Sequence, residues 1–131
     1  DSFVERQIST LSGGERQKVL IAAALAQDAS ILLLDEPTTF LDPHHQLDVL
    51  RLLARLNLES GVTIIAVTHD INAAILSGDE LLALHAGRLA YQGSPEEFLS
   101  GPALNKIFGS DFHFVPHPVT GQRIIVPEAV R

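Results

Sequence analysis

The chain has 131 residues, of which 46% are hydrophobic and 19% charged, and its formal net charge at pH 7 is −7. This length corresponds to one globular domain, and the apolar share is sufficient for a buried core. The negative charge argues against nucleic-acid binding, which requires a basic surface. The sequence contains no cysteine, which excludes disulfides and thiolate metal sites among these residues. No apolar run approaches the ~20 residues of a membrane-spanning helix, so we expect no direct insertion into a membrane.

The first recognisable element is a helix expected over residues 13–27. Ser12 and Glu15 have the spacing of a capping box, in which the two side chains satisfy backbone N–H groups at the helix start. Gly13 and Gly14 lie in the first turn, where their missing Cβ atoms allow another backbone or a ligand to come close. The free N–H groups and the positive end of the helix dipole favour a phosphate at this position. An ordinary capped helix with a loose first turn is the alternative.

A buried strand expected over residues 31–35 ends in two adjacent carboxylates, Asp35 and Glu36. A short aliphatic run between turn signals is typical of a fully buried parallel strand. Ligands of open α/β sheets bind outside the carboxyl ends of the strands, where both carboxylates fall. One of them can hold Mg²⁺ as an oxygen ligand, and the other can act as a general base toward water. The alternative is a solvated pair of side chains, but the helix start shortly upstream argues against it.

A capped helix is expected over residues 43–59. Asp42 is its predicted N-cap, and Pro43 suits the first helical position because it has no N–H to satisfy. The neighbouring pair His44 and His45 is then predicted to lie in the first helical turn rather than to ligate a metal.

A second strand, expected over residues 62–68, ends in the polar pair His69 and Asp70. This places another pair of polar side chains at a strand end. A single histidine in such a position is more often structural than functional, so the strand end by itself leaves both interpretations open.

The remaining residues are expected to form short helices and antiparallel strands. His113 and His117 could ligate a metal together only within a helix, which the prolines around them exclude. The expected elements are a helix over 71–77, a hairpin of 80–85 and 88–92 with its turn at 86–87, helices beginning at 95 and spanning 103–108, and extended segments at 113–118 and 123–127.

Four motifs occur in a fixed order: L-S-G-G-E-R-Q from residue 11, L-L-L-D-E-P from residue 32, L-D from residue 41 and V-T-H-D from residue 67. In the order and spacing of these motifs, residues 6–92 closely resemble the nucleotide-binding subunits of ABC transporters. The resemblance implies an α/β fold, the C-terminal half of a P-loop NTPase domain. Its parallel strands would be covered by helices and followed by a β-hairpin and short helices.

The first motif resembles the signature motif of that family. Carried over by position, Ser12, Gly13, Gly14 and Gln17 would contact the γ-phosphate of an ATP molecule held by the opposite subunit of a dimer.

The other motifs imply catalytic and interface roles. Asp35 matches the aspartate that helps to hold Mg²⁺, and Glu36 matches the catalytic glutamate that activates water. Asp42 matches an aspartate at the dimer interface. His69 matches the histidine that contacts the γ-phosphate.

The sequence departs from the family because it contains no G-x-x-x-x-G-K-[ST] segment, whose backbone amides cradle the nucleotide phosphates. The family's adenine-stacking aromatic residue and the glutamine that senses the membrane partner are also missing. We therefore expect the chain to be the C-terminal half of a longer subunit and to bind ATP negligibly by itself. We also expect self-association or poor solubility, because the strand ending at His69 would lack a neighbour.

The motifs together predict the ATP-hydrolysing subunit of an ABC importer that uses ATP and Mg²⁺. It would act as a homodimer with transmembrane permease subunits, peripherally at the cytoplasmic face of the inner (plasma) membrane. The tail pattern, G-S-P-E-E-F followed by F-G-x-D-F and V-P-H-P-x-T-G, is similar to ATPases of iron-siderophore, haem and cobalamin importers. Residues 1–92 would carry the motifs, and residues 93–131 would form a helical and extended tail of the same domain.

Two alternatives to this prediction remain. The chain could be a non-catalytic module that offers only its signature face to a partner. It could also come from a non-transport ABC ATPase of the translation-factor or chromosome-maintenance kind.

Overall fold

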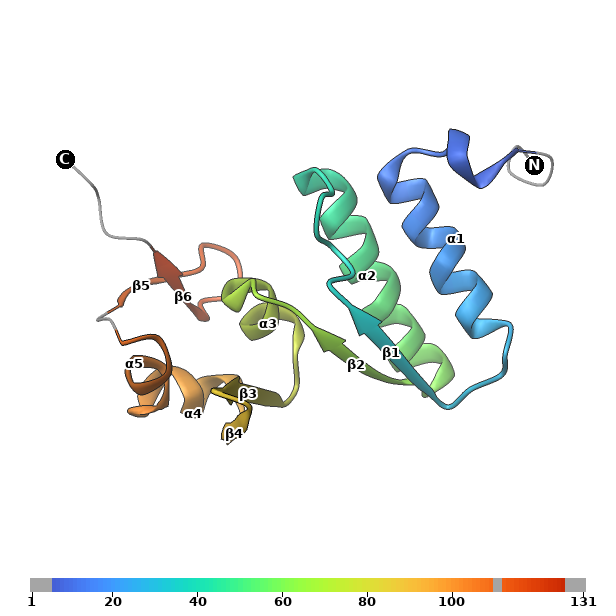
Figure 1. The fold of residues 1–131 in the computed structure, drawn as a ribbon. Helices are drawn as coiled ribbons and strands as arrows, with labels where there is room; N and C mark the ends of the chain where they lie inside the picture. Colours follow the sequence, from blue (N-terminus) through green and yellow to red (C-terminus); the bar gives the residue numbers. More distant parts are fainter. Residues whose placement is uncertain (1–5, 110–111, 127–131) are drawn as a thin grey trace. The chain divides into compact units, whose positions relative to one another are not determined.

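The computed structural model describes residues 6–109 and 112–126 and contains two compact units, Asp1–His69 and Asp70–Arg131. Figure 1 shows the helices and strands of both units. The functional division predicted after residue 92 lies inside the second unit and stays a prediction.

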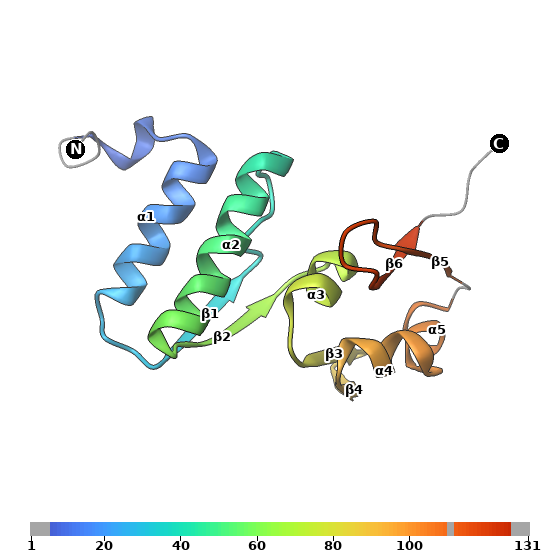
Figure 2. The same ribbon diagram turned by 180° about the vertical axis from the view of Figure 1, so that it is seen from behind.

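The first unit is a parallel strand pair with helices on one side. The two strands are joined through a helix, as expected for a parallel connection, and residue Leu33 lies opposite Ile65 in their register. Both views show α2 across one face of the pair and α1 beside α2 (Figures 1 and 2). The elements are a 3₁₀ turn Ile8–Thr10, α1 Gly13–Leu25, β1 Ile31–Asp35, α2 Pro43–Ser60 and β2 Thr63–Val67.

The core of the first unit lies between the helices and the covered sheet face. Its buried side chains come from both helices, from β1 and from the residue before β2: Ile21, Leu32, Val49, Leu53 and Val62.

The opposite face of β1 and β2 is open in the described structure. Leu33, Ile65 and Val67 are 72%, 45% and 60% exposed. The expectation of a strand buried on both faces is therefore wrong for β1, because only one face of the pair carries helices within the described residues of the first unit. The apolar open face fits the expected self-association, which stays a prediction.

The helix starts of the first unit follow the predicted caps. Ser12 and Glu15 form the complete capping box of α1, and Asp42 caps α2 with Pro43 in the first turn. Helix α1 ends at Leu25, two residues before the predicted end. The chain tightens there into i→i−3 hydrogen bonds and then passes through a left-handed Asp28 (φ 54°), a conformation that ends a helix.

The second unit consists of short helices and two antiparallel hairpins. The turn between β3 and β4 has positive φ at Ala86 and Gly87, as the predicted hairpin requires. The predicted extended segments pair with each other as β5 and β6, whereas residue 127 lies outside the described residues. The elements are α3 Ile71–Ser77, β3 Leu81–His85, β4 Arg88–Gly93, α4 Pro95–Ser100, α5 Ala103–Phe108, β5 His113–Pro116 and β6 Arg123–Val126.

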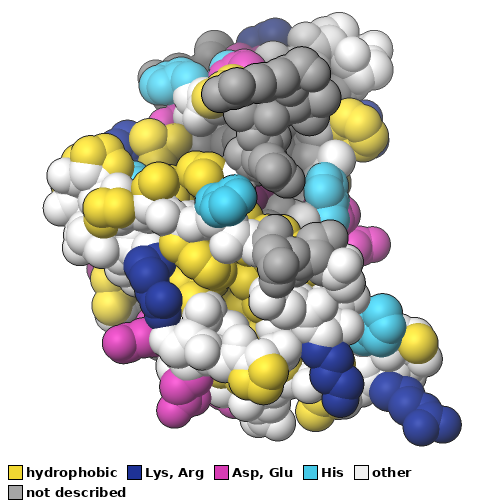
Figure 3. Space-filling view, turned by 90° about the vertical axis from the view of Figure 1, so that its left-hand side faces the viewer, with side chains coloured by type: hydrophobic (Ala, Val, Ile, Leu, Met, Phe, Trp, Pro, Cys, Tyr) yellow, Lys and Arg dark blue, Asp and Glu magenta, His cyan; other side chains and the backbone are white. Residues whose placement is uncertain are grey.

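A second core holds these elements together. Ile75, Phe98, Leu99 and Leu104 are its buried side chains. Asn72 links α3 to β6 through two hydrogen bonds of 2.8 Å each. Its side-chain NH2 group donates to the carbonyl of Ile125, and its side-chain oxygen accepts from the N–H of the same residue. On the face drawn in Figure 3, apolar side chains nevertheless reach the surface among charged ones.

His117 has a local role in the turn between β5 and β6. Its Nδ1 atom accepts backbone N–H groups of Val119 and Thr120 at 3.3 and 3.2 Å. This ring nitrogen therefore stabilises the turn.

None of the helices in the described parts of the chain has the length and apolar character needed to cross a bilayer.

Candidate functional site

The site is built at the carboxyl ends of β1 and β2. Because the two strands run parallel, both end at the same edge of the sheet, where α/β proteins bind ligands. The backbone N–H of Glu36 donates to the carbonyl of Val67 at 2.9 Å, which extends the strand pairing by one residue. Glu36 then leaves the strand with φ 48°, a left-handed conformation that non-glycine residues adopt rarely.

Glu36 and His69 meet at this edge, although they are far apart in sequence. The Nδ1 atom of His69 lies 2.7 Å from Oε1 of Glu36, and the backbone N–H of His69 donates to the same oxygen at 3.1 Å. Since an ionised carboxylate only accepts hydrogen bonds, Nδ1 is the protonated ring nitrogen in this contact. The structure therefore brings together the two residues for which a catalytic role was predicted.

Thr39 binds the other carboxylate oxygen of Glu36, a role that the sequence did not predict. Its hydroxyl donates to Oε2 of Glu36 at 2.6 Å. This hydrogen bond, followed by that from His69, lowers the pKa of Glu36 below its ordinary value of 4.5. Glu36 is thus an ionised, oriented carboxylate at neutral pH.

Asp35 lies beside this pair at the last position of β1. Its side chain is exposed on the sheet face away from α1 and α2. An exposed carboxylate at a strand end is a suitable hard-oxygen ligand for Mg²⁺, which proteins commonly bind through one or two carboxylates together with substrate phosphates. The residue fits the predicted role, which stays a prediction.

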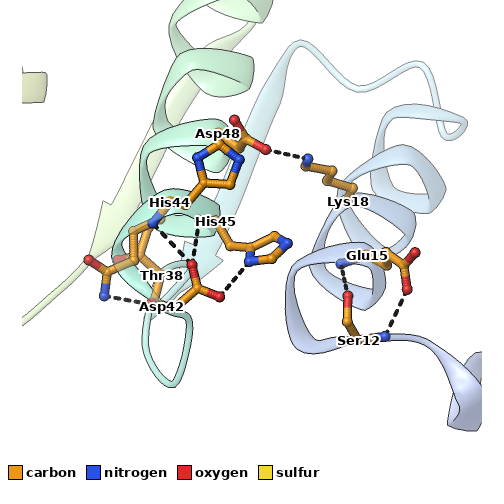
Figure 4. A network of polar contacts seen from close by, with 9 residues as sticks. Ser12, Glu15, Lys18, Thr38, Asp42, His44, His45 and Asp48 are labelled. Carbon is orange, nitrogen blue, oxygen red and sulfur yellow. Dashed lines mark hydrogen bonds and ion pairs between the residues drawn. The ribbon is translucent and has the colours of Figure 1, made fainter.

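The predicted phosphate-contacting segment forms the start of α1 (Figure 4). The Ser12 hydroxyl accepts from the Glu15 N–H at 3.3 Å, and Oε2 of Glu15 accepts from the Ser12 N–H at 2.9 Å. The latter bond is the main reason that the pKa of Glu15 is lowered. Ser12 and Gly13 are exposed, Gln17 is half-buried, and Gly14 is buried.

Asp42 organises the start of α2. Its Oδ1 accepts the N–H groups of His44 and His45 at 3.0 Å each, and its Oδ2 accepts from Nδ1 of His45 at 2.6 Å. The backbone bond from His45, followed by its side chain, lowers the pKa of Asp42. The expectation that both histidines lie in the first helical turn is confirmed. Sequence reasoning did not predict that the His45 ring reaches α1, since only its local position was visible.

Replacing Thr39 with valine is expected to raise the pKa of Glu36 toward 4.5, because the variant loses the strongest donor to the carboxylate. Above pH 4.5 the carboxylate contacts contribute fully to stability, and the contribution is lost as the pH falls through the lower folded-state pKa. Thr39→Val should therefore reduce the loss of folding stability that occurs as the pH falls from 4.5 through the folded-state pKa of Glu36. A carbon-detected NMR titration of the Glu36 carboxyl group measures the shift.

Thr63→Val is the matched control, because Thr63 is an exposed threonine at the opposite end of β2. It should leave the Glu36 titration unchanged. An unaltered Glu36 pKa in Thr39→Val would show that the hydroxyl does not control the carboxylate.

Known proteins that are similar in sequence to this chain are ATP-binding proteins of transport systems. The sequence profile for ABC transporters matches residues 1–39. The ferric enterobactin transport ATP-binding protein FepC of Escherichia coli (strain K12) is 44% identical over 125 residues, which cover 95% of this chain and 46% of FepC. This chain belongs to the ABC transporter ATP-binding protein family. A second relative, the hemin import ATP-binding protein HmuV of Rhodococcus jostii (strain RHA1), is 40% identical over 96% of this chain and 43% of its own length.

The fold comparison confirms the predicted α/β class. A solved ABC transporter structure in an inward-facing conformation superposes with a TM-score of 0.84 and 30% identity, over 95% of this chain and 50% of that chain. The strands and helices are therefore those of part of an ABC ATPase domain. The chain spans about half the length of the relatives it matches.

Proposed function

We propose that residues 1–131 form the C-terminal part of a longer ATP-hydrolysing subunit, here called the complete subunit, of an ABC importer. The contact between Glu36 and His69 at the strand ends carries this proposal, because it presents an oriented carboxylate and an imidazole at the ligand-binding edge. The names of relatives such as FepC and HmuV support an iron-siderophore or haem as the cargo.

The reaction would be attack of water on the γ-phosphorus of ATP, which breaks the bond to the oxygen bridging the β- and γ-phosphates and releases ADP and inorganic phosphate. Glu36 orients the water and accepts its proton, while the bonds from Thr39 and His69 hold the carboxylate in place. Asp35 would hold Mg²⁺, which when bound neutralises charge on the phosphate oxygens. Positioning and electrostatic stabilisation account for most of the catalysis in phosphoryl transfer.

The start of α1 would serve a second copy of the subunit. Ser12 and Gly13 are exposed at a helix N-terminus, where N–H groups and the helix dipole favour a phosphate. In a homodimer these residues, with Gly14 and Gln17, complete the ATP site of the neighbouring subunit, and Asp42 lies at the interface. The dimer would act on transmembrane permease subunits, peripherally at the cytoplasmic face of the inner (plasma) membrane.

The 131-residue chain by itself is then a non-catalytic module. A phosphate cradle of the G-x-x-x-x-G-K-[ST] type, which is not found in these residues, would come from the rest of the complete subunit. The chain therefore supplies the water-activating carboxylate and the signature face but lacks its own contacts for the β- and γ-phosphates.

Calorimetric ATP titration and a phosphate-release assay test this proposal. Chain 1–131 is expected to show no saturable binding at micromolar ATP and no turnover, whereas the complete subunit binds and hydrolyses ATP. Micromolar affinity of the chain, or steady hydrolysis that Glu36→Gln abolishes, would refute the non-catalytic assignment. A complete subunit without ATPase activity would refute the catalytic one.

A further inference from the structure

Gly14 is buried although it lies in the first turn of α1, beside the exposed Ser12 and Gly13. A Cβ atom added to Gly14 would overlap Cδ2 of the His45 ring and lie 2.7 Å from its Cγ. Close-packed protein interiors do not accommodate such contacts without movement. The imidazole of His45 thus fills the space that a side chain at position 14 would need.

The His45 ring is held in this position from its own side. Its Nδ1 atom donates to Oδ2 of Asp42, which also caps α2 through two backbone N–H groups. Figure 4 shows the ring extending from the first turn of α2 toward the start of α1, next to the capping box. One carboxylate therefore fixes both the beginning of α2 and the ring that lies against Gly14.

Two further contacts make the junction of α1 and α2 specific. A Cβ on Gly13 would lie 3.2 Å from Cδ2 of Leu41, the residue before Asp42. Farther along the helices, Nζ of Lys18 pairs with Oδ2 of Asp48 at 2.9 Å. The first turn of α1 consequently packs directly on the turn that contains Asp42.

We propose that His45 is a positioning residue that transmits the placement of Asp42 to the first turn of α1. The absence of a side chain at Gly14 is required by His45 within the same chain, independently of any ligand. The consequence for catalysis rests on the proposed function. The imidazole of His45 determines the position of the Ser12–Gly13 segment that a neighbouring subunit would contact. A shift of Asp42 therefore moves the ring and this segment together.

The contact is tested in chain 1–131 with a double-mutant cycle. Alanine normally stabilises a helix relative to glycine, but Gly14→Ala should lower the melting temperature by roughly 5–15 °C because it overpacks the ring. His45→Ala removes the ring and leaves only its Cβ, 3.0 Å from the added atom, so adding Gly14→Ala in that background should lower the melting temperature much less than in the unsubstituted chain. Equal losses in both backgrounds would overturn the proposal.

Gly13→Ala is the matched control for this cycle. Its added Cβ meets the flexible end of Leu41, so its smaller effect should be the same with and without the His45 ring. If Gly14→Ala does not fold, the contact between His45 and Gly14 is measured by NMR in the unsubstituted chain. A nuclear Overhauser effect between His45 Hδ2 and Gly14 Hα is expected, and its absence would overturn the contact.

The positioning role is tested in the complete subunit by steady-state kinetics. His45→Ala should lower kcat by up to about 10²-fold, the range expected for a small misplacement of reacting groups, while the Kd for ATP of the isolated subunit stays unchanged. His45→Asn, which can still donate to Asp42, should recover part of kcat, and Glu59→Gln at the exposed far end of α2 should leave kcat unaltered. An unchanged kcat in His45→Ala would overturn the positioning role while leaving the proposed ATPase function intact.

Discussion

Truncation of Ile21 to alanine is expected to lower the free energy of unfolding of the first unit by about 2–4 kcal/mol, within the range for large-to-small core substitutions. Ile21 is 2% exposed and lies in the middle of α1, against Leu32, Val49 and Leu53. The substitution leaves a cavity beneath the sheet face that α2 covers. Urea denaturation measures the loss in the free energy of unfolding, and amide hydrogen exchange of the core residues gives a second measure of it.

Leu58→Ala is the control for this substitution. Leu58 lies in α2 but is 83% exposed, so its truncation should change the unfolding free energy by less than about 0.5 kcal/mol. Similar effects of the two substitutions would contradict the assignment of Ile21 to the core.

Glu36→Gln in the complete subunit is expected to lower kcat for ATP hydrolysis by about 10²–10⁴-fold, the usual contribution of a general base. Glutamine has nearly the same shape: its one side-chain oxygen can accept the bond from His69, and its NH2 group, in the place of Oε2, can donate to the Thr39 hydroxyl oxygen. It cannot take a proton from water at neutral pH. The Kd for ATP should therefore change little, and the loss should appear in kcat measured by phosphate release.

Glu59→Gln provides a charge-matched control at the exposed end of α2. It should leave both kcat and the Kd for ATP unchanged. A Glu36→Gln subunit that hydrolyses ATP at the normal rate would exclude Glu36 as the base.

Features determined by local sequence could be predicted well. The capping box of Ser12 and Glu15 and the Asp42-Pro43 helix start depend on residues within one turn, and the structure confirms both. The positions of the catalytic candidates also followed, because polar residues at the ends of parallel strands must share one edge of the sheet. The meeting of Glu36 and His69 is a consequence of this topology.

Features determined by packing between elements could not be predicted. Thr39 lies within the turn that follows β1, and the left-handed backbone of Glu36 brings the carboxylate to the Thr39 hydroxyl. The burial of Gly14 depends on the crossing of α1 and α2, since no local pattern indicates that His45 would lie there. The sequence left open whether another backbone or a ligand comes close to this glycine, and the structure places a side chain of the same chain against it.

The central claim is that Glu36 and His69 lie at a nucleotide site of the complete subunit. The most direct test is an NMR titration of that subunit with Mg-ATP, followed at the Glu36 carboxyl and the His69 ring. Both signals are expected to shift with saturation at the same ATP concentration, whereas signals of the remote Leu58 stay in place. ATP binding that leaves Glu36 and His69 unperturbed would contradict the account.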